Sequence, residues 1–281
     1  LLPSKKNPRA LAALEALSKE VGQMPEAKIS RKYSHALTGF AAKLTDEQVE
    51  KLKKDPRVES IEPDSYMYPA GEVSVQSSPD WGLDRIDQRE GTLDESYSYT
   101  ASGNGVTAYM VDTGIRDTHA DFEGRVTLGH DFIWEDEPEN RDILQGEGAD
   151  CWGHGTAVAA ALGGAQSGVA KNVDLVSVRV WGCDGASPRT RIIAAVDWIT
   201  EYAIQPAVVN MSGAHADYLV AVAIQNSIET GIVYVGVAGN QNEDGCEFFP
   251  PDTSGRLTGG ASDIDDKRFS DSNYGECVDL Y

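Results

Sequence analysis

The feature that most constrains the fold is an alternation of short apolar runs with helical patterns between residues 106 and 237. Helical spacing of apolar residues appears at Thr190–Tyr202 and Leu219–Glu229. Such an alternation is typical of a mostly parallel sheet with helices on both faces, and chemistry is expected where its strands reach their carboxyl ends. The sequence therefore predicts an α/β domain whose clearest strands are Val106–Val111, Leu175–Val180, Ala207–Met211 and Ile232–Val237.

Charge is distributed unevenly along the chain. Of its 281 residues, 24 are Lys or Arg and 45 are Asp or Glu, which gives a net charge of −21. Residues 1–76 hold 12 basic and 11 acidic residues, so the acidity lies in the remainder. A polar segment from Pro69 to Asp80 separates the two parts. We therefore expect a small domain at 1–68, a linker at 69–78 and a large domain at 79–281.

The acidity and the hydropathy pattern exclude several classes of function. A net charge of −21 repels a phosphate backbone and an anionic bilayer surface, so neither nucleic acid nor membrane is expected as a partner. No apolar run approaches the roughly 20 residues that cross a bilayer. The chain opens with Leu1-Leu2-Pro3, without an initiator Met or a signal-like apolar stretch, so we interpret its start as a cut end.

The first domain has the pattern of a small α+β unit with the order α-β-β-α-β. A helix is predicted to end near Gly22, because apolar residues recur at steps of three and four before it. Strands at 28–33 and 37–44 follow, then a second helix that opens with a capping box at Thr45 and Gln48, and a strand at 58–61. This order is a ferredoxin-like split βαβ unit that lacks its first strand. An unrelated small α+β domain would show the same pattern.

In the large domain, polar side chains follow two of the predicted strands. Asp112 directly follows the strand that ends at Val111, and Asn240 follows the strand and turn that end at Gly239. A carboxylate there can orient a base, and an amide can stabilise an oxyanion. Each also has a purely structural interpretation, because Asp is common in turns and Asn adopts a left-handed turn after Gly.

His154 stands between Gly153 and Gly155, at the start of an Ala-rich stretch that reads as a buried helix. The flanking glycines let other backbone approach the imidazole closely. A neutral imidazole oriented by a buried carboxylate can take a proton from a serine hydroxyl and later give it to a leaving amine. A helix cap or a metal ligand is the alternative, although the other histidines are not at metal-ligand spacing.

These residues resemble the motifs of subtilisin-like serine proteases, in order and spacing. The proteinase K branch, with its aqualysin-type enzymes, is the most similar group, and the first domain resembles the inhibitory propeptide of that family. The resemblance implies a three-layer subtilisin-like domain in which Asp112 orients His154, His154 is the general base and Asn240 is the oxyanion donor. It rests on Val111–Ile115, Asp150–Thr156, Ala238–Asn240, Pro79–Ile86 and Phe269–Gly275 in the large domain, and on Tyr33–Ala41 and Asp55–Val58 in the first.

The four cysteines allow three pairings, and spacing alone does not choose among them. Four reduced thiols with structural or metal-binding roles are a further alternative, although no Cys-x-x-Cys pair occurs. The resemblance implies disulfides Cys151–Cys183 and Cys246–Cys277. Disulfides imply an oxidising compartment, and hence a secreted protein.

The chain departs from the family pattern near the expected site. The family nucleophile belongs to a Gly-Thr-Ser motif that would follow Tyr281, so residues 1–281 are expected to be an incomplete and inactive catalytic domain. Ala157 stands where the family usually has a second His. By resemblance, Ser212, Gly213 and Ala214 form the substrate-binding strand, where the family reads Ser-Leu-Gly-Gly.

Two hypotheses follow for the function. The first is a secreted serine endopeptidase zymogen that acts on protein or peptide substrates, is inhibited by its own propeptide and is monomeric. The second is a non-catalytic peptide-binding or inhibitory scaffold that has lost its nucleophile. The resemblance implies no catalytic cofactor, but it suggests a structural Ca²⁺ held by Asp279 together with backbone carbonyls near Ser254 and Arg256.

Overall fold

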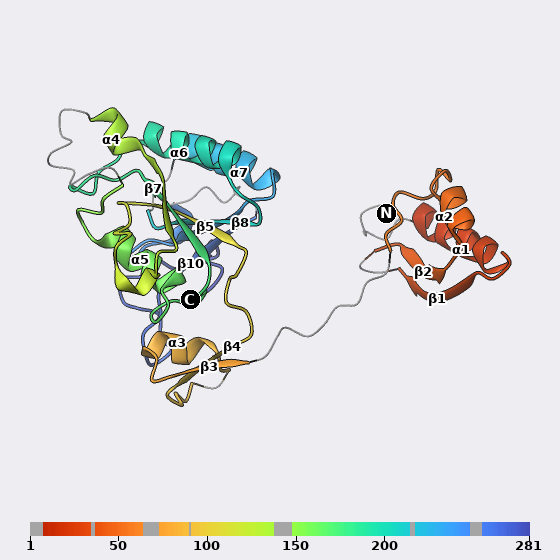
Figure 1. Cartoon of the computed structure of the whole chain (residues 1–281), viewed down its shortest axis with the longest axis horizontal. Coiled ribbons are helices and arrows are strands. Elements are labelled where there is room, and N and C mark those ends of the chain that lie inside the picture. Colours follow the sequence, from red (N-terminus) through yellow and green to blue (C-terminus); the bar gives the residue numbers. More distant parts are fainter. Residues whose placement is uncertain are drawn as a thin grey trace. The chain divides into compact units, whose positions relative to one another are not determined.

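The computed structural model describes residues 8–34, 37–63, 73–89, 91–137, 148–213, 217–247 and 255–281. The chain divides into two compact units, residues 1–69 and 70–281 (Figure 1). No helix in the described ranges is long and apolar enough to cross a bilayer.

The first unit packs two helices against a two-stranded antiparallel sheet. Its elements are α1 (Pro8–Gly22), β1 (Lys28–Tyr33), β2 (Gly39–Lys43) and α2 (Asp46–Leu52). The predicted capping box is present, because Thr45 accepts from the Gln48 backbone while the Gln48 side chain accepts from the Thr45 backbone. Leu17, Val21 and Leu52 form the core of the unit.

The strand predicted at Val58–Ile61 is wrong, because no strand forms there. The backbone N–H of Val58 donates to Asp55 O at 2.9 Å, and so closes a turn instead of pairing with a sheet. Val58 and Ile61 still pack against the core of the unit. Their apolar character therefore reflects burial of side chains and not strand pairing.

The second unit is built on a six-stranded parallel sheet of order β10-β9-β8-β5-β7-β6. The four predicted strands are present, each within one residue of its expected bounds at both ends, and β6 and β10 lie at the sheet edges. The strands are β5 (Thr107–Asp112), β6 (Val126–Asp131), β7 (Asp174–Arg179), β8 (Ala207–Met211), β9 (Val233–Val237) and β10 (Arg256–Gly259).

Helices cover the sheet on both faces, which gives three layers (Figure 1). Helices α6 (Arg189–Tyr202) and α7 (Tyr218–Glu229) lie on one face, and α5 (His154–Gly163) lies on the other. Successive side chains of β5 point to opposite faces of the sheet, as expected for a sheet that is covered on both faces. Tyr109 and Val111 belong to the core under α6 and α7, whereas Ala108 and Met110 belong to the core under α5.

Smaller elements complete the second unit. Strands β3 (Ser74–Ser77) and β4 (Ser96–Tyr99) form an antiparallel pair beside the short helix α3 (Trp81–Ile86). Helix α4 (Phe132–Asp136) follows β6, and two 3₁₀ turns, η1 (Ala120–Phe122) and η3 (Gly245–Glu247), lie in connections. The central strand β5 is buried along its whole length. Its carboxyl end is therefore a rigid place from which to present a side chain.

Candidate active site

Asp112 is the last residue of β5 and is fully buried. Its Oδ1 accepts the backbone N–H of Thr113 at 2.7 Å, and its Oδ2 is buried with no hydrogen-bond partner in the described part of the chain. Burial raises the pKa of Asp112 above its usual value, and hydrogen bonds from His154 and Thr113 oppose this shift only in part.

His154 is the first residue of α5, which packs with its amino end against β5. Two glycines make this approach possible. Gly153 caps the helix in the left-handed region, with a φ of 90°. A Cβ on Gly155 would overlap Gly114 O and lie 3.0 Å from Asp112 Cβ. A larger residue at 155 would therefore push α5 away from Asp112.

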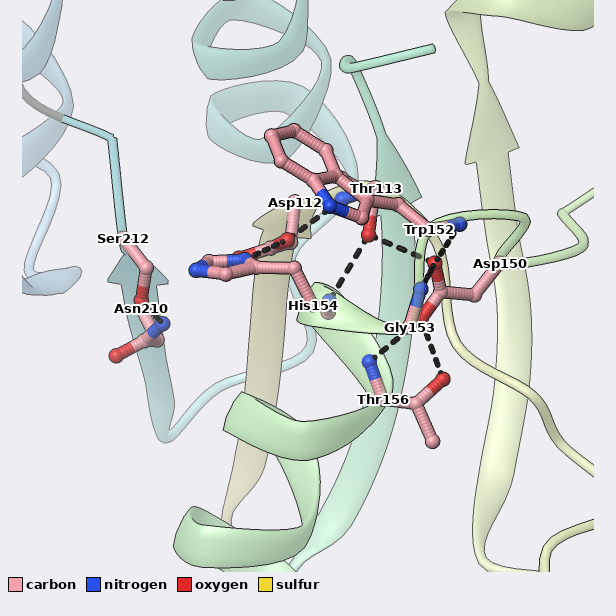
Figure 2. A network of polar contacts seen from close by, with 10 residues as sticks. Asp112, Thr113, Asp150, Trp152, Gly153, His154, Thr156, Asn210 and Ser212 are labelled. Atoms are coloured by element: carbon pink, nitrogen blue, oxygen red, sulfur yellow. Dashed lines mark hydrogen bonds and ion pairs between the residues drawn. The ribbon is translucent and has the colours of Figure 1, made fainter. Parts of the chain in front are cut away.

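Asp112 and His154 form a hydrogen bond of 2.7 Å between Oδ1 and Nδ1 (Figure 2). The Asp112 side chain is 0% exposed and the His154 side chain is 45% exposed. The structure thus joins the two predicted residues, 42 positions apart in the sequence. The geometry leaves Nε2 of the imidazole directed to the side on which Asn210 and Ser212 lie (Figure 2).

Asp150 holds the loop before His154, a role that the sequence did not reveal. Its carboxylate accepts from the hydroxyls of Thr113 and Thr156 at 2.8 and 2.6 Å. It also accepts the backbone N–H groups of Trp152, Gly153 and Thr156 at 3.1, 2.7 and 2.9 Å. The signal in the sequence was its position four residues before His154. An Asp side chain shortly before a helix often accepts hydrogen bonds from the backbone of the turn that leads into the helix.

Burial acts to raise the pKa of Asp150, but the hydrogen bonds from Thr156, Gly153 and Thr113 outweigh it, so the pKa lies below its ordinary value of 3.8. Thr113 extends the network, because its hydroxyl accepts the N–H of Gly155 at 2.9 Å. The end of β5, the loop before α5 and the first turn of α5 are thus tied to one carboxylate (Figure 2).

The other predicted site residues lie at neighbouring strand ends. Ser212 and Gly213 follow β8, and the Ser212 hydroxyl accepts from Asn210 Nδ2 at 2.8 Å. Asn240 follows β9, and its backbone N–H donates to Gln241 Oε1 at 2.9 Å. Since β5, β8 and β9 are parallel, these residues lie with Asp112 at the side of the sheet where the strands have their carboxyl ends. Ala214 lies outside the described residues.

The disulfides are Cys151–Cys183 and Cys246–Cys277, the pairing that the resemblance implies. Cys151–Cys183 joins the loop before His154 to the loop after β7. Beneath it, the fully buried Arg179 donates to Cys151 Sγ at 3.2 Å and pairs with Asp131 Oδ2 at 3.2 Å. The position of the site loop is therefore fixed covalently as well as by Asp150.

Asp279 was expected to hold a structural calcium ion. Its Oδ2 accepts the Thr258 N–H at 2.7 Å, and its own N–H donates to Thr258 O at 2.9 Å. Burial lowers the pKa of Arg256 to about 10, and the charge of Asp279 opposes that shift. Asp279 thus holds the backbone of β10 at Thr258, and its negative charge favours the protonated form of Arg256. No group of three or more His, Cys, Asp or Glu that could hold a metal ion occurs among the described residues. The expected calcium site uses a single carboxylate with backbone carbonyls, and Ser254 lies outside the described residues, so that site stays a prediction.

A model of the subtilase family matches residues 103–281, and a model of the peptidase inhibitor I9 family matches residues 4–70. An extracellular serine proteinase of Thermus sp. (strain Rt41A) is 43% identical over 256 residues, which are 91% of this chain and 60% of that protein. The alkaline serine exoprotease A of Vibrio alginolyticus is 41% identical over 253 residues, which are 89% of this chain and 46% of that protein.

A solved structure agrees with these matches. The crystal structure of a cold adapted subtilisin-like serine proteinase superposes with a TM-score of 0.67 at 41% identity, covering 73% of this chain and 72% of that chain. The present chain spans only about half to three fifths of the length of the two relatives named above.

Proposed function

The chain belongs to the subtilase family, and on that premise we propose that it forms most of the zymogen of a secreted serine endopeptidase. The observation that carries this proposal is the 2.7 Å hydrogen bond between the buried Asp112 and the half-exposed His154, at the carboxyl edge of a parallel sheet. The names of the Thermus and Vibrio relatives describe proteases, one of them extracellular.

Each residue of the proposed site has one role. As a carboxylate, Asp112 accepts the Nδ1–H of His154 and so fixes the tautomer whose Nε2 is free to take a proton. His154 removes the proton from a serine hydroxyl while the oxygen attacks the substrate carbonyl, and later gives it to the leaving amine. We propose that this serine follows Tyr281 in the longer protein, a placement supported by the greater length of the relatives.

Asn240 is proposed to donate its side-chain amide to the oxyanion of the tetrahedral intermediate. Its place after β9, on the same sheet edge as Asp112, supports this role. Removing one such donor from a subtilisin costs about 3 kcal/mol of transition-state stabilisation. Ser212 and Gly213 are proposed to pair with the backbone of an extended substrate, as in other cases of strand addition.

The first unit is proposed to act as an inhibitory propeptide at residues 1–68, with maturation within residues 69–78 and the protease domain at 79–281. The match of residues 4–70 to the I9 inhibitor family supports this assignment. The two disulfides support an oxidising compartment and secretion. A monomer is proposed for the mature enzyme.

The test is active-site labelling of the full-length protein, produced from the reading frame continued beyond Tyr281. A fluorophosphonate probe should label a serine within a Gly-Thr-Ser motif, and the His154→Ala variant should lose the label. A full-length protein that stays unlabelled while its fold and disulfides are intact would contradict the proposal.

A second candidate, a peptide-binding scaffold without catalysis, is favoured by the departures at Ala157 and Gly213. The same labelling experiment separates the two candidates. Tight binding of peptides by an unlabelled full-length protein would support the scaffold.

A further inference from the structure

We infer that Trp152 is a specificity-determining residue, whose indole forms an apolar wall beside His154 against which a large apolar side chain of the substrate packs. The inference rests on the proposed function, because it names the class of peptide that the same site would select.

Trp152 is exposed and yet fixed in position. Its side chain is among the exposed large apolar groups, with 56% of the residue accessible to solvent. A Cβ placed on Gly185 would overlap the six-membered part of the indole, so the ring lies directly on that glycine. Gly185 is presented by a turn in which its N–H donates to Gly182 O at 3.0 Å. Only a residue without a side chain leaves room for the indole.

The backbone of Trp152 is held as firmly as its ring. Its N–H donates to Asp150 Oδ1 at 3.1 Å, and the preceding residue, Cys151, is bonded to Cys183 in the segment that carries Gly185. A side chain ordered before binding loses little conformational entropy when a ligand packs on it. An exposed indole that is already immobilised is therefore suited to recognition.

The indole stands next to the imidazole. The ring centroids of Trp152 and His154 are 6.1 Å apart, with an interplanar angle of 40°. Figure 2 shows the indole beside the Asp112–His154 pair. The His154 side chain is still 45% exposed beside the indole, so part of the imidazole is accessible to a substrate. A substrate whose carbonyl lies near that part would place a neighbouring side chain against the indole.

A second indole lies on the substrate-binding strand proposed above. A Cβ on Gly213 would overlap the ring of Trp181, so Trp181 covers the place that a side chain at position 213 would occupy. Trp181 is partly buried and packs against the core under α6 and α7. Two indoles, each packed on a glycine, therefore lie beside the residues that are proposed to contact the substrate. Such surfaces favour aromatic and large aliphatic side chains.

The test measures peptide binding, which does not depend on the nucleophile. Acetylated tetrapeptide amides of alanine, each with one Phe at a different position, would be titrated into the full 281-residue chain. Binding would be followed by the NMR shifts of the His154 imidazole. At one position, Phe should tighten binding on the order of 10-fold over the all-Ala peptide, since 1.4 kcal/mol corresponds to that ratio. An inhibitory first unit, as proposed above, would compete with every peptide alike and leave the ratio unchanged.

Three variants make the test specific. Trp152→Ser should abolish the advantage of Phe, and Trp152→Phe should retain most of it. Trp81→Ser is the matched control, because Trp81 is 43% exposed but lies on α3, and it should keep the advantage in full. Circular dichroism would check that each variant is folded.

Two results would overturn the inference, and they differ in what else they overturn. An unchanged advantage of Phe in Trp152→Ser would show that the indole does not select the substrate, and the proposed protease site would stand. The absence of any shift at His154 with every peptide, also after cleavage within residues 69–78 and removal of the first unit, would overturn the proposed function as well.

Discussion

The side chain of Asp112 is completely buried, whereas the imidazole of His154 to which it is hydrogen-bonded is 45% exposed. This difference in exposure suits a general base and the residue that orients it. The buried carboxylate sets the orientation of the ring, and the exposed half of the ring can meet a substrate.

Asp112→Asn should leave the fold intact and reduce kcat by roughly 10⁴-fold, because an amide in this place favours the wrong tautomer of His154. The rate would be measured on a chromogenic peptide with the full-length enzyme. In residues 1–281 alone, the imidazole proton signals of His154 should change. Asp174→Asn is the control, since Asp174 is an exposed acid at the start of β7. Equal rates in Asp112→Asn and the control would contradict the assigned role.

Asp150→Asn should lower the free energy of unfolding at pH 7 by on the order of 2 kcal/mol, because an amide cannot accept all of the hydrogen bonds that this carboxylate accepts. The pKa of Asp150 is below its ordinary value of 3.8 in the folded chain. Its stabilising contribution is therefore fully present above that value and is lost as the pH falls through the lower folded pKa. Thermal unfolding at pH 7 and pH 2.5 would show that the difference in the free energy of unfolding between the wild type and the variant is smaller at the lower pH. A constant difference at both pH values would argue against this linkage.

The strength of the apolar pattern decided which parts of the fold could be predicted. Strands β5, β7, β8 and β9 and helices α6 and α7 are buried on a regular period, so residues such as Val209 and Ile199 indicate them directly. Strand β6 was not predicted. It lies at a sheet edge, and its sequence from Val126 to Asp131 contains partly exposed polar residues that give no such signal.

The candidate site divides in a similar way. Asp112 and His154 could be found because their neighbours in the sequence form recognisable motifs, and the structure brings them together. The positions of Trp152 and Trp181 could not be found, because each indole is placed by a glycine distant in the sequence, Gly185 or Gly213. Contacts of this kind are made by the fold, and a local pattern does not contain them.

The two disulfides make a matched pair, since their sequence separations are 32 and 31 residues. Loop-closure entropy predicts about 3 to 4 kcal/mol for each. Replacing Cys151 and Cys183 by Ala should cost more than replacing Cys246 and Cys277 by Ala, because Arg179 also loses its contact with Cys151 Sγ. Denaturant unfolding of the two double variants would measure both values. A smaller cost for the Cys151–Cys183 pair would mean that the contact with Arg179 contributes nothing.

Gly155→Ala should impair the site through backbone displacement alone. The added Cβ would overlap Gly114 O and crowd the Cβ of Asp112, so the amino end of α5 must move away from β5. A shift of about 1 Å in a catalytic group can reduce the rate about 100-fold, and a loss of this size in kcat is expected with the full-length enzyme. Gly82→Ala is the matched control, because a Cβ there meets nothing within 4 Å and alanine suits helix α3. A variant Gly155→Ala with full activity would show that the close approach of α5 to Asp112 is not required.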